Sequence, residues 1–402
     1  MKSRAQSPEQ SREQDREQDP AKSQGESPGT SPAESPVKAA VSTTMTSTTS
    51  TTTGNTGGTG GTGGTGGTGG TGGGTTGTMT TTVLATVRTA LRSALASMLP
   101  LPRRGGPAAQ ALLPLTERVP AMAAPCRMHP AVYAIEAAVI DWARRTGLRA
   151  DPDVGYHRMA GRAFAEFDAA AAALFAQWLT WLFHLDDELD ERSGPLEVFH
   201  GMLKGASRHP LEAAFADLWR VTSARMSDRW RARFAVGLQR QYDACRTEAE
   251  NRAAGRMPTL EEYPALRRGT VGPYLYDLVE PCLRVEVPGW LHESEPWQRL
   301  VDACSDVTAW CNDVASRPKE HGDVHNFVVL AMRQLGLGER AATAWVLDRI
   351  AARCQDMSEA ARRLPLDDLE PKAARDVSKV ACAYLAAPRA HLDWLLESKR
   401  YA

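Results

Sequence analysis

The sequence predicts an all-α domain at residues 116–402, preceded by a long segment that cannot form a packed core. From about Ala121 onward, segments rich in Ala, Leu, Arg and Glu are separated by Pro and Gly and contain few β-branched runs. The alternation of apolar and polar residues that is typical of strands is hard to find anywhere. The helical part would be about 280 residues long, which is large but plausible for one domain.

The first part of the chain has the composition of a disordered extension. Residues 1–41 are rich in Ser, Gln, Glu, Lys, Arg and Pro, residues 42–53 are almost all Ser and Thr, and six T-G-G units run from Thr56 to Gly73. Such segments bury too little apolar surface to offset the lost chain entropy. We therefore expect residues 1–115 to be a disordered low-complexity region, apart from a weak amphipathic helix at residues 81–99.

Composition excludes several classes of protein. The start of the chain has no apolar segment typical of a signal peptide, and residues 81–99 are too short and too charged to span a membrane. Seven cysteines without a C-x-x-C pair argue against a disulfide framework and a zinc ribbon, so a reducing cytoplasm is expected. A formal charge of −1, from 47 basic and 48 acidic side chains, does not suggest a nucleic-acid binder.

The segment 165–190 (AEFDAAAAALFAQWLTWLFHLDDELD) carries the strongest helix prediction. On a helix that advances about 100° per residue, Phe175, Leu182 and Asp186 share one face, with Asp190 at its flank. If the carboxylates only faced solvent, they would lie on the side of the helix opposite the apolar stripe. The pattern therefore indicates a pocket that is apolar below and acidic at its rim, although a simple acidic end of a buried helix stays open.

The aromatic residues of this segment divide into two groups. Trp178 and Trp181 are expected in the core. Phe175 and Phe183 lie on the carboxylate side, and we expect them to form an aromatic wall that faces a cation.

A second polar cluster follows in the stretch Asn312–Asn326. Asn312, Ser316 and Glu320 recur in steps of four and form a ridge that drifts by about 40° per step on a helix. Pro318 interrupts this ridge, because proline removes a backbone hydrogen bond and clashes with the preceding turn. The helix must either kink or end early there, and the position of Glu320 depends on which occurs.

Both clusters offer the hard oxygen ligands that Mg²⁺ prefers. This ion is usually held by one or two carboxylates together with substrate phosphates, so two facing clusters could clamp a diphosphate. The candidate metal ligands are Asp186, Asp187, Asp190, Asn312, Ser316 and Glu320.

These motifs, D-D-x-x-D at 186–190 and N-D-x-x-S-x-x-x-E at 312–320, resemble the metal-binding motifs of bacterial class I terpene synthases. The resemblance covers about residues 120–402. It implies a helical bundle with a central active-site cavity and three Mg²⁺ ions.

The resemblance extends to candidate phosphate-binding residues. The segment 258–280 is similar to the family's Y-x-x-x-R segment, in which an arginine senses the diphosphate. Arg267 fits that position, with Arg268 as the alternative, and a guanidinium offers a bidentate fork to phosphate oxygens. Lys319 and the pair Arg400-Tyr401 also resemble family residues that close over the diphosphate.

The family breaks its helix a few residues after the sensing arginine, so that a backbone carbonyl faces the ionising carbon. Thr270, Val271 and Gly272 span that position in this chain. The sequence does not say which of their carbonyls would act.

The implied reaction is Mg²⁺-dependent ionisation and cyclisation of an acyclic isoprenyl diphosphate, with release of diphosphate. Farnesyl diphosphate, which gives a sesquiterpene, is the expected substrate. Geranyl or 2-methylgeranyl diphosphate, as used by 2-methylisoborneol synthases, and geranylgeranyl diphosphate stay open. A chain-elongating prenyl diphosphate synthase is disfavoured, because those enzymes carry two Asp-rich motifs.

A different class of function is also open for the N-terminal part. The chain could be a tethered or cargo protein whose tail binds a partner or a shell. The chain could also form a homodimer.

Overall fold

The computed structural model describes residues 105–191, 209–320 and 323–401, and within these ranges every regular element is a helix. This confirms the all-α prediction. The longer helices are α6 (Val132–Thr146), α8 (Ala169–Glu191), α10 (Pro210–Ser223), α11 (Asp228–Ala254), α15 (Glu295–Ser316), α17 (Glu339–Arg362) and α18 (Pro371–Glu397). The shorter ones are α3 (Pro107–Gln110), α4 (Leu113–Arg118), α5 (Pro120–Ala123), α7 (Tyr156–Ala163), α12 (Tyr263–Thr270), α13 (Val279–Leu283), α14 (Gly289–His292) and α16 (Phe327–Leu335), with 3₁₀ turns η1 (Pro273–Leu275), η2 (Leu366–Asp368) and η3 (Lys399–Tyr401).

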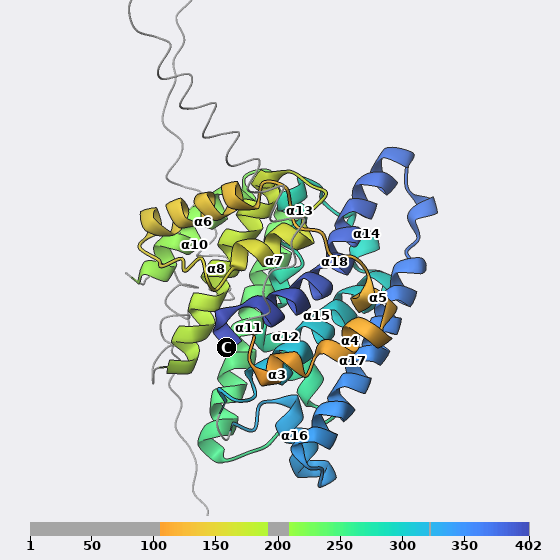
Figure 1. The fold of residues 1–402 in the computed structure, drawn as a ribbon. Coiled ribbons are helices and arrows are strands. Elements are labelled where there is room, and N and C mark those ends of the chain that lie inside the picture. The colour runs from red at the N-terminus through yellow and green to blue at the C-terminus, as the bar shows by residue number, and fades with distance from the viewer. Residues whose placement is uncertain (1–104, 192–208, 321–322, 402) are drawn as a thin grey trace, which may run out of the picture. The chain divides into compact units, whose positions relative to one another are not determined.

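The helices pack around α8, α15 and α18. Helix α8 packs against α6, α7 and α10, whereas α18 packs against both α7 and α15, and α15 packs against α17 (Figure 1). Trp178 and Trp181 are fully buried, as expected, and their indole nitrogens donate to Thr222 Oγ1 and to the Leu211 carbonyl, each at 2.9 Å. Burial of these large aromatic rings anchors α8 in the core.

Helix α8 begins after Asp168 and not at Ala165, where the sequence pattern placed its start. Asp168 Oδ1 accepts a hydrogen bond from the Ala170 amide at 3.0 Å, as an N-capping carboxylate does. The cap leaves the acidic end of the helix unchanged, so Asp186 still follows the apolar stripe.

Helix α15 ends at Ser316, which decides between the two alternatives that Pro318 left open. The amides of Lys319 and Glu320 both donate to the Ser316 carbonyl, at 2.7 and 3.3 Å, so the chain turns instead of continuing as a kinked helix. Proline cannot donate a backbone hydrogen bond, which suits a turn. The turn still leaves Glu320 near the end of the helix that carries Asn312.

The packed region already includes residues 105–115, which the sequence led us to expect in the disordered extension. The Gly105 amide donates to the Leu396 carbonyl at 3.0 Å and the Gly106 amide to the Tyr401 carbonyl at 2.6 Å. Leu112 is fully buried. A Cβ atom at Gly105 would lie only 2.6 Å from the Leu395 carbonyl oxygen, so this approach requires glycine. The expected helix at 81–99 lies outside the described residues.

These contacts predict different results for two N-terminal truncations. A chain that begins at Gly105 should keep turnover, because both glycine amides and the helices that follow are retained. A chain that begins at Ala111 should lose activity and melt earlier, because the C-terminal segment loses both backbone hydrogen bonds. Turnover and the melting temperature of the two proteins test this. Loss of turnover in the longer chain would instead mean that residues 1–104 serve the site.

Two further expectations concern composition. Among the described helices, none has a stretch both long and apolar enough to cross a membrane. All seven cysteines are free thiols.

Candidate active site

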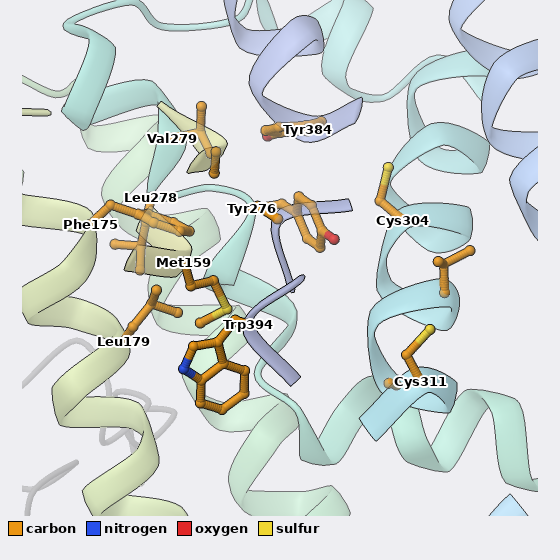
Figure 2. Close-up of a cluster of buried hydrophobic side chains, with 14 of the residues drawn as sticks. Met159, Phe175, Leu179, Tyr276, Leu278, Val279, Cys304, Cys311, Tyr384 and Trp394 are labelled. Carbon is orange, nitrogen blue, oxygen red and sulfur yellow. The ribbon is translucent and has the colours of Figure 1, made fainter. Parts of the chain in front are cut away.

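An apolar cavity lies between α7, α8, α12, α15 and α18. Its volume is about 100 Å³, several times the roughly 10–15 Å³ that one water requires. Figure 2 shows side chains from several segments of the chain, including Met159, Phe175, Leu179 and Tyr276, drawn together in this part of the core. Phe175 and Phe183 both line the cavity, as expected of an aromatic wall.

Asp186 lies at the rim of this cavity. Its side chain is 51% exposed and lines the cavity together with Phe183. Restricted solvation raises the pKa of Asp186, while the guanidinium groups of Arg400 and Arg267 oppose that shift. An apolar stripe that ends in a carboxylate therefore leads from the cavity to its mouth.

Asp187 pairs with the C-terminal arginine. Arg400 donates to both carboxylate oxygens of Asp187, at 3.0 and 2.6 Å, and reaches Asp186 Oδ2 at 3.3 Å. Such bidentate pairs are strong and directional. Asp190 belongs to α8, but its side chain lies outside what the structure describes.

The second cluster reaches the same cavity from α15. Asn312 lines it; its side-chain oxygen accepts from Arg267 Nη2 at 2.9 Å, and its amide nitrogen donates to the Tyr401 hydroxyl at 2.7 Å. Glu320 Oε2 accepts from Asn326 Nδ2 at 2.8 Å. Burial and the neighbouring carboxylate of Asp313 raise the pKa of Glu320 to about 7.

The donor set fits a hard divalent cation. Asp186, Asn312, Ser316 and Glu320 offer only oxygen ligands, of the kinds that Mg²⁺ takes. The buried hydroxyl of Ser316 has no partner within hydrogen-bond distance among the described residues, although it lies close enough to Glu320 to lower the pKa of that carboxyl. A buried hydroxyl without a partner is costly, so an ion or an ordered water at this point would satisfy it.

Arg267 faces the cavity, and its neighbour Arg268 does not. Arg267 donates to Asp313 Oδ1 at 2.8 Å, to Asn312 Oδ1 and to Thr270 Oγ1 at 3.3 Å. A guanidinium has five N–H donors, and these three contacts with described residues leave two for a further acceptor. Arg268 instead donates to both oxygens of the buried Asp306, at 2.8 and 2.9 Å.

The break after α12 leaves one carbonyl open. The Thr270 carbonyl accepts from Gln241 Nε2 at 3.1 Å and the Gly272 carbonyl from the Leu275 amide at 3.0 Å. No described group donates to the carbonyl of Val271, a residue that lines the cavity. Gly272 has φ 90°, which glycine adopts without strain, so the chain can turn here.

The remaining basic residues lie around the mouth. The Lys319 amino group stands 5.0 Å from the centre of the Tyr401 ring, and the Arg400 guanidinium 5.0 Å from the centre of the Phe183 ring. Partial burial and the charge of Arg400 lower the pKa of Lys319. The four residues Arg267, Lys319, Arg400 and Tyr401 thus lie close to the two acidic clusters.

Asp313 is a central residue of the site to which the sequence assigned no role. It is fully buried and accepts from Arg267 Nε, from the Tyr263 hydroxyl at 2.8 Å and from the Phe327 amide at 3.2 Å. Asn326 supports the same region, since its amide nitrogen donates to the Asp313 carbonyl at 2.7 Å. Asp313 and Asn326 both belong to the polar stretch Asn312–Asn326 that the sequence singled out, but only the fold shows what these side chains hold.

Comparisons with known proteins agree on one family. A family model described as "Terpene synthase family 2, C-terminal metal binding" matches residues 177–356. A (-)-delta-cadinene synthase of Streptomyces clavuligerus is 32% identical over 254 residues, which cover 57% of this chain and 75% of that protein. A (+)-T-muurolol synthase of Roseiflexus castenholzii, described as cyclising (2E,6E)-farnesyl diphosphate, is 29% identical over 290 residues, covering 67% of this chain and 88% of that protein.

Solved structures show the same fold. The crystal structure of germacradien-4-ol synthase from Streptomyces citricolor superposes with a TM-score of 0.59 at 24% identity, covering 67% of this chain and 95% of that one. The helical bundle with a central cavity, expected from the two motifs, is thereby confirmed.

Proposed function

Because the chain belongs to the terpene synthase family, whose members release diphosphate from isoprenyl diphosphates, we propose that it ionises and cyclises farnesyl diphosphate with the help of Mg²⁺. The proposal rests above all on one observation. Asp186 and Asn312 come from helices far apart in the sequence, yet both line one apolar cavity, with Arg267 beside them.

In this proposal Asp186, Asn312, Ser316 and Glu320 hold the metal, three ions being expected from the family. Bound Mg²⁺ would supply Lewis-acid stabilisation of the negative charge that the leaving diphosphate gains. Asp187 would orient Arg400, since its two carboxylate oxygens accept from Nη1 and Nη2 of that guanidinium.

The basic side chains bind and orient the diphosphate. Two N–H groups of Arg267 contact no described residue, and its other contacts fix it between Asn312 and Asp313, so it would be held in place for an anion. Lys319 and Arg400 add positive charge, and the Tyr401 hydroxyl orients Asn312. These groups strengthen their interaction as charge grows on the leaving oxygen, which lowers the barrier to ionisation.

The hydrocarbon chain of the substrate would occupy the apolar cavity. Phe175 and Phe183 line this space with aromatic side chains, which can stabilise a carbocation, and the surrounding aliphatic side chains would exclude water. The open carbonyl of Val271 would place the negative end of a dipole towards the cavity.

Incubation with the C10, 2-methyl-C10, C15 and C20 diphosphates and Mg²⁺, followed by gas chromatography of the organic extract, tests the proposal. We expect cyclic sesquiterpenes from farnesyl diphosphate as the main products. A relative that cyclises farnesyl diphosphate supports this choice of substrate. Preferred turnover of another chain length would correct the substrate alone, whereas no turnover of any of the four would contradict the proposed function.

A further inference from the structure

His391 is a polar side chain on the cavity-facing stripe of α18. Ala383, Ala387 and His391 lie four residues apart, so they share one face of the helix, and all three line the cavity. The histidine is 4% exposed. Its ring packs against Trp394, with centroids 5.5 Å apart.

The imidazole of His391 makes no hydrogen bond with any described residue. Its Nδ1 atom is buried and without a partner. The other polar side chains of the cavity lining all have partners: Asp186, Arg267, Thr270, Tyr276, Thr308 and Asn312. An ordered water or a bound ligand can satisfy such a buried group, and His391 lines the cavity in which either would lie.

The ring is a neutral base. Burial lowers the pKa of His391 to about 3, and the charge of Arg267 acts in the same direction. Both nitrogens therefore carry no net charge at neutral pH, and one of them has a free electron pair. A C–H bond beside a carbocation is a far stronger acid than imidazolium, so proton transfer to this ring remains favourable despite its lowered basicity.

We propose that His391 is the catalytic base that ends the reaction by deprotonating the last carbocation. The C–H bond next to the cationic carbon breaks, its electron pair becomes the C=C bond of the product, and the proton forms an N–H bond on the imidazole. The imidazolium returns the proton to water when the product leaves. This inference rests on the proposed function. It predicts that the main product is a hydrocarbon, which has one more C=C bond than the last carbocation, and not an alcohol.

Two substitutions test the role of His391. His391→Phe keeps an aromatic ring beside Trp394 but has no nitrogen, and His391→Gln keeps a polar group that is not basic. Ionisation takes place at the mouth, so diphosphate release should stay within about threefold of the wild type in both. We expect the share of the main olefin to fall at least about tenfold, with alcohols from water capture or olefins from earlier cations in its place.

His157 supplies the matched control. It is equally buried at 5% exposure and its pKa is likewise lowered to about 3, but it stands 3.6 Å from Glu136 and does not line the cavity. His157→Phe should leave the product profile unchanged. Melting temperatures establish that each variant is folded.

The readouts separate the inference from the proposed function. If the wild type releases diphosphate and both His391 variants keep its products, the diphosphate or another group is the base and the inference is wrong. An alcohol as the main product of the wild type would also overturn it. If the wild type releases no diphosphate from any of the four substrates, the proposed function itself has failed.

Discussion

Asp186→Ala should reduce turnover by about 10²–10³-fold while the protein remains folded. The side chain is half exposed, lines the mouth of the cavity and makes no core contact that alanine would remove. Loss of this carboxylate should remove a metal ligand that acts on the leaving diphosphate. The rate of diphosphate release, together with the melting temperature, measures both parts of the prediction. Asn312→Ala should lose activity to a similar extent.

Glu188→Ala is the matched control on the same helix. Glu188 belongs to the same acidic run, but its carboxylate is directed to His209, 4.0 Å away, and does not line the cavity. This variant should keep most of the activity. If Asp186→Ala kept more than a few percent of turnover, or if both variants fell alike, the first cluster would be only the acidic end of a buried helix.

Arg267→Lys should lower kcat by about 10²-fold and change KM much less. A lysine keeps the charge but cannot reach Asp313, Asn312 and Thr270 at once and still offer two donors to a diphosphate. The lost contacts matter most when charge develops on the leaving group, so the effect should appear in kcat. Steady-state kinetics with the preferred diphosphate check this.

Arg268→Lys separates catalysis from stability. Both arginines pair with a buried carboxylate, Asp313 for Arg267 and Asp306 for Arg268, but only Arg267 lines the cavity. Arg268→Lys should therefore lower stability by about 1–2 kcal/mol and leave kcat nearly unchanged. If Arg268→Lys lowered kcat and Arg267→Lys did not, Arg268 would be the residue that senses the diphosphate.

The helices and the motifs were predictable from local patterns, and their boundaries were not. The stripe from Phe175 to Asp186 repeats with helical spacing, so the position of the acidic end followed from the sequence. The start of the same helix was not predictable from this pattern. The pattern begins at Ala165, but the Asp168 side chain caps the helix, which therefore begins only after Asp168. Pro318 indicated an interruption of the second helix, but only the backbone hydrogen bonds to the Ser316 carbonyl show that this helix ends at Ser316.

Residues that act through long-range contacts could not be found from the sequence. Asp313 is important because Tyr263, Arg267 and the Phe327 amide converge on it from three segments. His391 lies in an alanine-rich stretch, and its missing hydrogen bonds become visible only once the cavity is known. Gly105 likewise depends on the approach of Leu395, nearly the whole length of the domain away in sequence.

The central claim, that the two clusters together hold a metal-bound diphosphate at the mouth of the cavity, is tested most directly by thermal unfolding with inorganic diphosphate and Mg²⁺. We predict that the two ligands together stabilise the wild type, by about 2.7 kcal/mol at a ligand concentration one hundred times Kd, and that either ligand alone does so far less. Asp186→Ala and Asn312→Ala should each lose most of this stabilisation. Equal stabilisation by diphosphate without Mg²⁺, or full stabilisation of both variants, would contradict the account.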